Sequence, residues 1–249
     1  MNIIVLLKRV PDLVEDLEVD GSGKALDAEY LKFTLNEFDD HALEEALLLK
    51  EAGGGSVTAI ALDGEEVDKM LFTALAKGAD RALKVTGADP GDSTLALAKV
   101  LSEVVSGQPH DLVLTGVQAA DDRDGQLAPL VASLLGLPSV EVVTGVTPGE
   151  GTVTLLKEYA GGTVAEFEVD LPAVLGIQAA RQTPRYAPVS KVRQIQQSTT
   201  LDTVAAAAGD GDGSGFSVIE MTPPKTGEGA QMLDGVEELL ELLVSKGVV

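Results

Sequence analysis

The sequence predicts an α/β protein built on a doubly wound, mostly parallel β-sheet. Apolar strand-like runs alternate with helix-like segments from residue 3 to residue 143, which is the pattern of repeated β-α-β units. The first run, Ile3–Leu7, is continuously apolar, as expected for a parallel strand that is covered on both faces. The chain has 249 residues, of which 45% are hydrophobic, and this is enough for one sizeable core.

The strands and helices of this sheet are expected in a regular order. Further strands are predicted at residues 57–62, 82–85, 111–115 and 139–143, and helices at residues 36–50, 65–77, 93–106 and 126–135. Each helix carries apolar or small side chains at the spacing of one helical face, as at Ala42 and Ala46. Asn36 is expected to cap the first helix, with Asp39 and Asp40 near the positive end of the helix dipole.

Beyond residue 143 the pattern changes to a small antiparallel β addition. Two strands are expected at Thr152–Tyr159 and Thr163–Val169, joined by Gly161-Gly162. A further strand is expected at Leu171–Ala179.

The end of the chain predicts an extended C-terminal arm. We expect one α/β domain at residues 1–199 and a linker with the arm at residues 200–249. Ala205–Gly215 consists of small and acidic residues with little to bury, which is typical of a flexible linker. Ala230–Lys246 predicts an amphipathic helix, which would dock either on its own domain or on a partner. Its apolar stripe is formed by Leu233, Val236, Leu240 and Leu243.

Composition and charge exclude several classes of function. The formal net charge of −22 repels polyphosphates and anionic membranes, so nucleic-acid binding is not expected. The absence of cysteine excludes disulfides, thiolate metal sites and a cysteine nucleophile. No apolar run is long enough to span a membrane, and Met1–Lys8 lacks the basic start of a signal peptide. The sequence therefore predicts a soluble, cytoplasmic protein without direct membrane insertion.

The sequence also lacks the short motifs of common α/β enzymes. There is no Gly-x-Gly-x-x-Gly after the first strand, no Gly-Lys-Ser/Thr P-loop and no Gly-x-Ser-x-Gly. His41 is expected to be an ordinary imidazole on a helix surface and His110 an exposed loop residue, so no metal site is predicted. An enzyme with its own active site is the weaker hypothesis, and no catalytic residue is predicted.

A ligand site is expected at the carboxyl ends of the parallel strands, because doubly wound sheets bind ligands where their topology switches. Three stretches should meet there, namely Leu6–Asp12, Asn36–Asp39 and Gly116–Gln126. A phosphate on the last of these would meet free backbone N–H groups at residues 125–127 and the positive end of the next helix. The aspartates of this loop would repel a phosphate unless they point away or cap amides, so an acidic surface loop is the alternative reading.

Four strings of the chain, in their order, resemble the β subunits of electron-transfer flavoproteins. They are Lys8-Arg9-Val10-Pro11-Asp12, the helix start Asn36–Ala46, the Ala-Leu-Ala-Lys-Gly-Ala-Asp-Arg run within Thr73–Ala82, and Pro184-Arg185-Tyr186. Leu171-Pro172-Ala173-Val174 is similar to a late signature of the same family. The resemblance covers nearly the whole chain and implies an adenine-nucleotide-binding, Rossmann-like fold.

In that family FAD is held mainly by the α subunit, whereas the β subunit binds AMP, or a second FAD in electron-bifurcating members. By position, the resemblance implies that Leu13 and Phe38 lie near the α-subunit flavin. The full set of cofactor contacts that it implies is Leu6, Leu13, Asn36, Glu37, Phe38, Asp39, Leu62, Gly116, Gln118, Ala119, Asp121, Arg123, Gly125 and Gln126.

The resemblance also implies protein partners. Val189 would lie in the segment that docks flavin-dependent dehydrogenases, next to Arg185 and Tyr186. The C-terminal arm would wrap onto the α subunit. The chain departs from the family after the docking segment, because the family's lysine-rich tail is replaced here by Val192–Gln197. This departure makes a different dehydrogenase partner plausible.

The sequence leaves the identity of the nucleotide open. The loop after residue 115 is shorter than usual and lacks the family's phosphate-holding Asn-Gln-Thr or Thr-Ala-Gln. Gln182–Tyr186 resembles bifurcating members, whereas Asp121-Asp122 resembles the AMP-binding type. We favour AMP, with a second FAD as the alternative.

Together these observations predict an electron carrier subunit that performs no bond chemistry. It would form a heterodimer with an α subunit and pass electrons from flavin-dependent dehydrogenases to a membrane ETF-quinone oxidoreductase. Two alternatives stay open, a bifurcating subunit and a stand-alone adenine-nucleotide-binding regulator of the universal-stress type. The C-terminal arm discriminates between carrier and regulator, because a stand-alone binder has no use for a tethered apolar helix.

Overall fold

The computed structural model describes residues 1–29, 31–88, 93–122, 124–206, 218–225, 227 and 229–248. The chain divides into two compact units. The first consists of Met1–Leu17 and Glu29–Ser217, and the second of Glu18–Ala28 and Val218–Val249.

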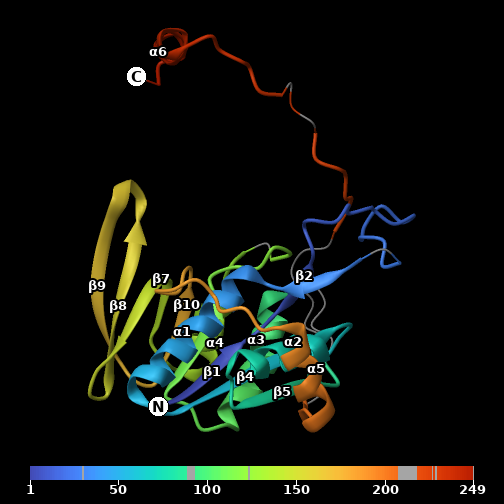
Figure 1. Cartoon of the computed structure of the whole chain (residues 1–249), viewed down its shortest axis with the longest axis vertical. Coiled ribbons are helices and arrows are strands. Elements are labelled where there is room, and N and C mark those ends of the chain that lie inside the picture. Colours follow the sequence, from blue (N-terminus) through green and yellow to red (C-terminus); the bar gives the residue numbers. More distant parts are fainter. Residues whose placement is uncertain are drawn as a thin grey trace. The chain divides into compact units, whose positions relative to one another are not determined.

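The first unit is built on a nine-stranded sheet, with strand order β11-β5-β4-β1-β6-β10-β7-β8-β9 (Figure 1). Its strands are β1 (Asn2–Leu6), β4 (Ser56–Leu62), β5 (Arg81–Thr86), β6 (Leu112–Gly116), β7 (Ser139–Pro148), β8 (Thr152–Tyr159), β9 (Thr163–Asp170), β10 (Ala173–Ile177) and β11 (Asp202–Ala205). All neighbouring pairs are parallel except β7–β8 and β8–β9. The predicted doubly wound, mostly parallel sheet with an antiparallel addition is confirmed.

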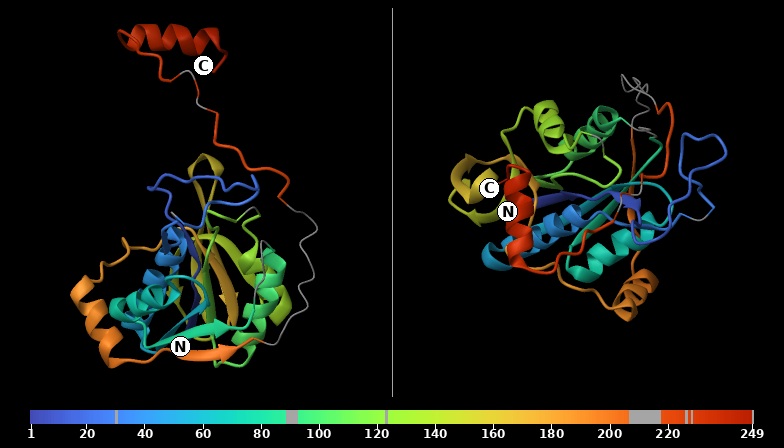
Figure 2. Two further views of the ribbon diagram at one scale, coloured as in Figure 1. Left: turned by 90° about the vertical axis from the view of Figure 1, so that its right-hand side faces the viewer. Right: turned by 90° about the horizontal axis from the view of Figure 1, so that it is seen from above.

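Helices cover both faces of this sheet (Figure 2). They are α1 (Glu37–Gly53), α2 (Val67–Lys77), α3 (Thr94–Ser106) and α4 (Leu127–Leu135), whereas α5 (Val189–Ser198) packs against α2. Alternate residues of β1 enter two separate apolar clusters. Ile3 and Val5 pack with α1 and α2, whereas Ile4 and Leu6 pack with α3 and α4. This division explains why the first strand is apolar at every position, since both of its faces are buried.

The topology switches between β1 and β6. After β1 the chain continues through α1 to β4 on one side, whereas after β6 it continues through α4 to strands on the other side. The two connections leave the carboxyl ends of these strands in opposite directions, and a crevice for ligands is expected at such a point.

Three strands and one helix of the first unit were not predicted. Strands β2 (Arg9–Pro11) and β3 (Phe33–Leu35) form a separate antiparallel pair, and β11 pairs in parallel with β5. These strands are too short to show a periodic pattern. Helix α5 occupies the predicted docking segment, for which no helix was expected, and none of its residues is buried. Its apolar residues Val189, Val192 and Ile195 recur at helical spacing, so a signal for this helix was present in the sequence and was missed.

The second unit contains helix α6 (Val236–Ser245). The predicted helix from Ala230 was wrong at its start, because the extended backbone of Gly235 (φ 179) separates residues 230–234 from the helix. All residues of α6 are at least partly exposed, including Val236 at 77% and Leu240 at 56%. Of the predicted linker Ala205–Gly215, residues 207–215 lie outside the described residues. The domain boundary near residue 199 stays a prediction.

Candidate functional site

A buried carboxylate joins the two strand ends at the switch point. Asp39, in the first turn of α1, is 4% exposed. Its Oδ2 accepts a hydrogen bond from the Lys8 backbone N–H at 2.7 Å, and its Oδ1 accepts one from the Gly116 N–H at 2.7 Å. Lys8 follows β1 and Gly116 ends β6, so Asp39 fixes the spacing of the two loops that leave the carboxyl edge.

Gly116 is required by this arrangement. A Cβ at position 116 would lie 2.5 Å from Asp39 Oδ1 and 2.7 Å from Phe38 Cβ. No side chain fits between β6 and the start of α1, because both neighbouring groups are held by the helix. The glycine therefore permits the close approach on which the Asp39 hydrogen bonds depend.

Asn36 joins a third segment to the same edge. It stands at the N-cap position of α1, but its side chain makes no capping hydrogen bond, and that part of our prediction was wrong. Instead its Nδ2 donates to the Gln118 carbonyl oxygen at 2.8 Å, while its backbone N–H donates to the Lys8 carbonyl oxygen at 3.0 Å. The side chain is 3% exposed, so it serves to hold the loop after β6.

The loop after β6 satisfies its amides with its own carboxylates. Asp122 Oδ1 accepts from the backbone N–H groups of Asp124 and Gly125, both at 3.2 Å. Asp124 Oδ1 accepts from the Gln126 N–H at 3.4 Å. Burial opposes ionisation of Asp122, but hydrogen bonds to its carboxylate outweigh it and lower its pKa. Two of the three amides that we had expected to be free for a phosphate, at Gly125 and Gln126, are thus engaged.

The other predicted cofactor residues are distributed around this edge. Leu6 and Ala119 are buried, Leu62 and Phe38 are partly buried, and Glu37 is exposed. Leu13 is 66% exposed. Asp121 forms an ion pair with Lys8 at 2.7 Å, which ties the loop after β6 to the end of β1. Arg123 lies outside the described residues. The cofactor contacts themselves stay predictions.

Asp39 gives the site a distinct pH dependence. Burial raises its pKa to about 7, although the two backbone hydrogen bonds act in the opposite direction. An unfolded aspartate has a pKa of about 3.9, so between about pH 4 and pH 7 the folded chain binds a proton that the unfolded chain does not. The stability that this proton confers is present at low pH and is lost as the pH rises through 7.

We therefore expect the D39N variant to lose part of the pH dependence of unfolding. Wild-type stability should fall relative to D39N between pH 5 and pH 8, since asparagine does not titrate. Urea unfolding followed by circular dichroism at several pH values measures this difference. Parallel pH profiles for the two proteins would show that Asp39 keeps an ordinary pKa.

The predicted docking residues lie together after β10, with different environments. Tyr186 is 80% exposed, and Val189, the first residue of α5, is 58% exposed. The Arg185 guanidinium instead bonds within the chain to Glu44 and Glu51. These bonds, led by the one to Glu44, raise the pKa of Arg185 further above its ordinary range. Their role in docking stays a prediction.

Sequence reasoning missed three acceptors on α1. The expectation that His41 is an ordinary surface imidazole was wrong, because His41 Nδ1 accepts a hydrogen bond from the Ala180 N–H at 3.1 Å. Glu44 and Glu45 are 3% and 0% exposed and bond to Arg185 and Arg181. A signal was present in the sequence, since two adjacent glutamates interrupt a helix face that is otherwise apolar.

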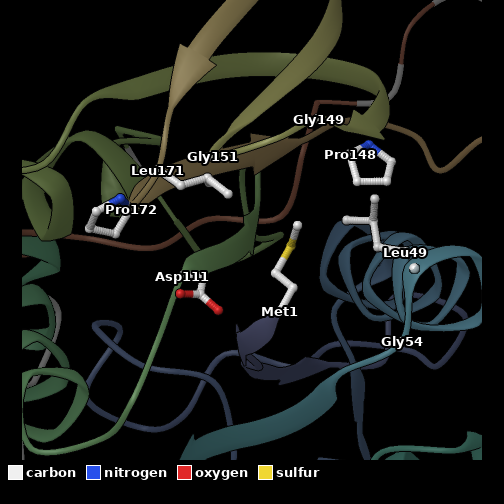
Figure 3. A pocket seen from close by; sticks show the side chains of 10 residues that line it. Met1, Leu49, Gly54, Asp111, Pro148, Gly149, Gly151, Leu171 and Pro172 are labelled. Atoms are coloured by element: carbon white, nitrogen blue, oxygen red, sulfur yellow. The ribbon is translucent and has the colours of Figure 1, made fainter.

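A pocket lies near the opposite edge of the sheet. It has a volume of about 530 Å³ and includes Met1, which precedes β1, and Asp111, which precedes β6 (Figure 3). Leu171 and Pro172, which precede β10, also line it. Asp111 Oδ2 accepts from the Asn2 backbone N–H at 2.6 Å. The end of α1 and the turn between β7 and β8 complete the lining, and this pocket is separate from the site at the carboxyl ends of β1 and β6.

The described parts of the chain offer neither a metal-binding cluster nor a membrane-spanning helix. Among these residues no group of three or more His, Asp or Glu side chains could hold a metal ion. None of the helices described is long and apolar enough to cross a membrane.

Comparison with known proteins identifies the family. The model of the electron transfer flavoprotein domain matches residues 25–208. The chain is 33% identical to the electron transfer flavoprotein subunit beta of Methylophilus methylotrophus, with 94% of this chain and 93% of that protein covered. It is 31% identical to the subunit beta of Bacillus subtilis over the full length of both, and 34% identical to that of Syntrophomonas wolfei over 95% and 92%. The chain therefore belongs to the electron transfer flavoprotein family, in which its full-length relatives are beta subunits.

Proposed function

We propose that this chain is the β subunit of a heterodimeric electron carrier of the cytoplasm. It pairs with an α subunit that holds most of the FAD, accepts electrons from flavin-dependent dehydrogenases and delivers them to a quinone reductase. The observation that carries this proposal is the full-length likeness to beta subunits, together with a sheet whose topology switches between β1 and β6, the kind of point at which doubly wound sheets bind nucleotides.

Exposed apolar side chains support an α-subunit partner. In the first unit, Leu13 is 66% exposed and Val14 is 93% exposed. In the second unit, helix α6 exposes Val236, Leu240 and Val244, of which Val244 is 57% exposed. Removal of such side chains from water by a partner is favourable and stabilises the complex. Leu13 would then lie against the FAD that the α subunit supplies, as the family resemblance implies.

The nucleotide on this subunit is AMP in our proposal. The switch point between β1 and β6 is where a doubly wound sheet is expected to bind a nucleotide, but the phosphate position that we predicted does not fit the loop as it stands. The Asp122 and Asp124 carboxylates occupy the Gly125 and Gln126 amides, so an anion could bind these amides only after the carboxylates move away.

This competition leads to a prediction for D122N. Asparagine keeps an oxygen that can cap the Gly125 N–H and removes the charge that opposes a phosphate. We expect the affinity of the heterodimer for AMP to rise about tenfold, corresponding to one charge contact. Isothermal titration with AMP measures this effect, with E37Q as the matched control because Glu37 is an exposed acid of the same edge. Equal AMP affinity in wild type and D122N would place the phosphate elsewhere.

The proposal is tested by co-expression with a candidate α subunit, followed by gel filtration and quantitation of FAD and AMP. A heterodimer with one FAD and one AMP is the expected result. Two FAD molecules would indicate the bifurcating alternative. If no complex forms and the isolated chain holds ATP or AMP, the carrier proposal fails and the regulator of the universal-stress type replaces it.

A further inference from the structure

One face of α1 holds the segment that follows β10. Three acceptors on the helix receive backbone N–H groups of this segment. His41 Nδ1 accepts from Ala180, Glu45 Oε2 from Arg181 at 3.0 Å, and Glu44 Oε2 from Arg185 at 2.9 Å. Residues 178–188 have no strand or helix of their own, so these bonds take the place of a backbone ladder.

The same two glutamates also bind the arginine side chains of the segment. Arg181 Nε donates to Glu45 Oε1 at 2.8 Å. Arg185 donates to Glu44 through two nitrogens, from Nε to Oε2 at 2.9 Å and from Nη2 to Oε1 at 2.9 Å. Each glutamate therefore holds one residue by its main chain and its guanidinium together, which fixes the path of the segment more closely than an ion pair alone.

Stability by itself is a weak reason for this arrangement. Both carboxylates are almost completely removed from water, and a buried ion pair recovers little more than the free energy that its desolvation costs. Its hydrogen bonds, in contrast, define one geometry. At the end of the segment this geometry exposes two side chains to solvent. Tyr186 is 80% exposed and Val189 is 58% exposed, whereas Ala187 between them is buried.

We propose that Glu44 and Glu45 are positioning residues for partner docking, which hold residues 180–187 so that Tyr186 and Val189 face the electron donor. The inference rests on the proposed function, in which this surface docks a flavin-dependent dehydrogenase. It assigns Arg185 to the inner side of the docking segment and assigns the contact with the partner to Tyr186 and Val189. Because the segment is already ordered in the free subunit, it loses less conformational entropy when the partner docks.

The test compares E44Q with E51Q in the complete heterodimer. Both variants weaken a bond to Arg185, but Glu51 is exposed and accepts no backbone N–H from the segment. The donor is the flavin-dependent dehydrogenase that reduces the wild-type heterodimer. We expect E44Q to raise KM for the heterodimer about tenfold, with kcat and FAD content unchanged, and E51Q to leave KM within about twofold. Hydrogen exchange at the Arg185 amide should speed up only in E44Q.

Two further variants separate this inference from the proposed function. If Y186A and V189A raise KM while E44Q does not, the docking surface is right and the positioning role of Glu44 is wrong. If Y186A and V189A leave KM unchanged, the docking surface itself is wrong. Should E44Q fail to fold, R185K provides the second test, because lysine keeps the charge but cannot bond to Glu44 through two nitrogens. Its KM is expected to rise, and an unchanged KM would overturn the inference.

Discussion

Replacement of Asp39 by alanine is expected to lower the free energy of unfolding by about 3 kcal/mol, because it leaves two backbone N–H groups without acceptors. These are the N–H of Lys8 after β1 and that of Gly116 at the end of β6, and the second is fully buried. The loss also frees the two loops that leave the carboxyl ends of β1 and β6, where we propose that AMP binds, so bound AMP should decrease in the same variant. Urea unfolding of the isolated chain and nucleotide quantitation on the heterodimer measure the two effects.

Glu37 offers the matched control for this prediction. It lies in the same first turn of α1 and is also a carboxylic acid, but it is exposed. E37A should therefore change the free energy of unfolding by less than about 0.5 kcal/mol. A loss in D39A no larger than that in E37A would show that the carboxylate does not hold the two strand ends together.

The second large effect concerns helix α6. Leu240 and Val244 lie one helical turn apart and are 56% and 57% exposed. Their replacement by serine together should weaken heterodimer formation about a hundredfold, since two buried aliphatic side chains contribute roughly 3 kcal/mol to an interface. The unfolding of the isolated chain should not change, because neither side chain is buried there. Analytical ultracentrifugation with the α subunit measures the association.

Glu241 provides the control on the same helix, where it too is exposed. An E241S variant should bind the α subunit with nearly wild-type affinity. If the double variant also binds with wild-type affinity, the apolar stripe of α6 does not contact the α subunit. Loss of stability in the isolated double variant would indicate instead that the helix belongs to the fold of the chain itself.

Long periodic elements were predictable from the sequence, because burial leaves a repeating pattern. The apolar run at Ile3–Leu7 corresponds to β1, and the small and apolar residues from Ala42 to Leu49 mark the buried face of α1. Strand β11 could not be predicted in this way, since it is short and none of its residues is buried, whereas α5 was missed although Val189, Val192 and Ile195 recur at helical spacing. Their positions depend on contacts with α2 and β5, which are distant in sequence.

The place of the candidate site in the fold was predictable from the sequence, but the hydrogen bonds within it were not. Loop residues after β1 and β6 and the start of α1 do meet at the carboxyl edge, as the switch-point rule requires. The sequence could not show that Asp39 accepts from both strand ends, or that Asn36 bonds to Gln118 instead of capping its helix. Such bonds join residues far apart along the chain, and no local preference encodes them.

Anaerobic reduction of the purified heterodimer by a flavin-dependent dehydrogenase and its substrate tests the central claim most directly. Catalytic amounts of the dehydrogenase should reduce the FAD of the heterodimer rapidly, and the α subunit alone should be reduced far more slowly. An equal rate for the α subunit with and without this chain would contradict the account, because the chain would then contribute neither a cofactor pocket nor a docking surface.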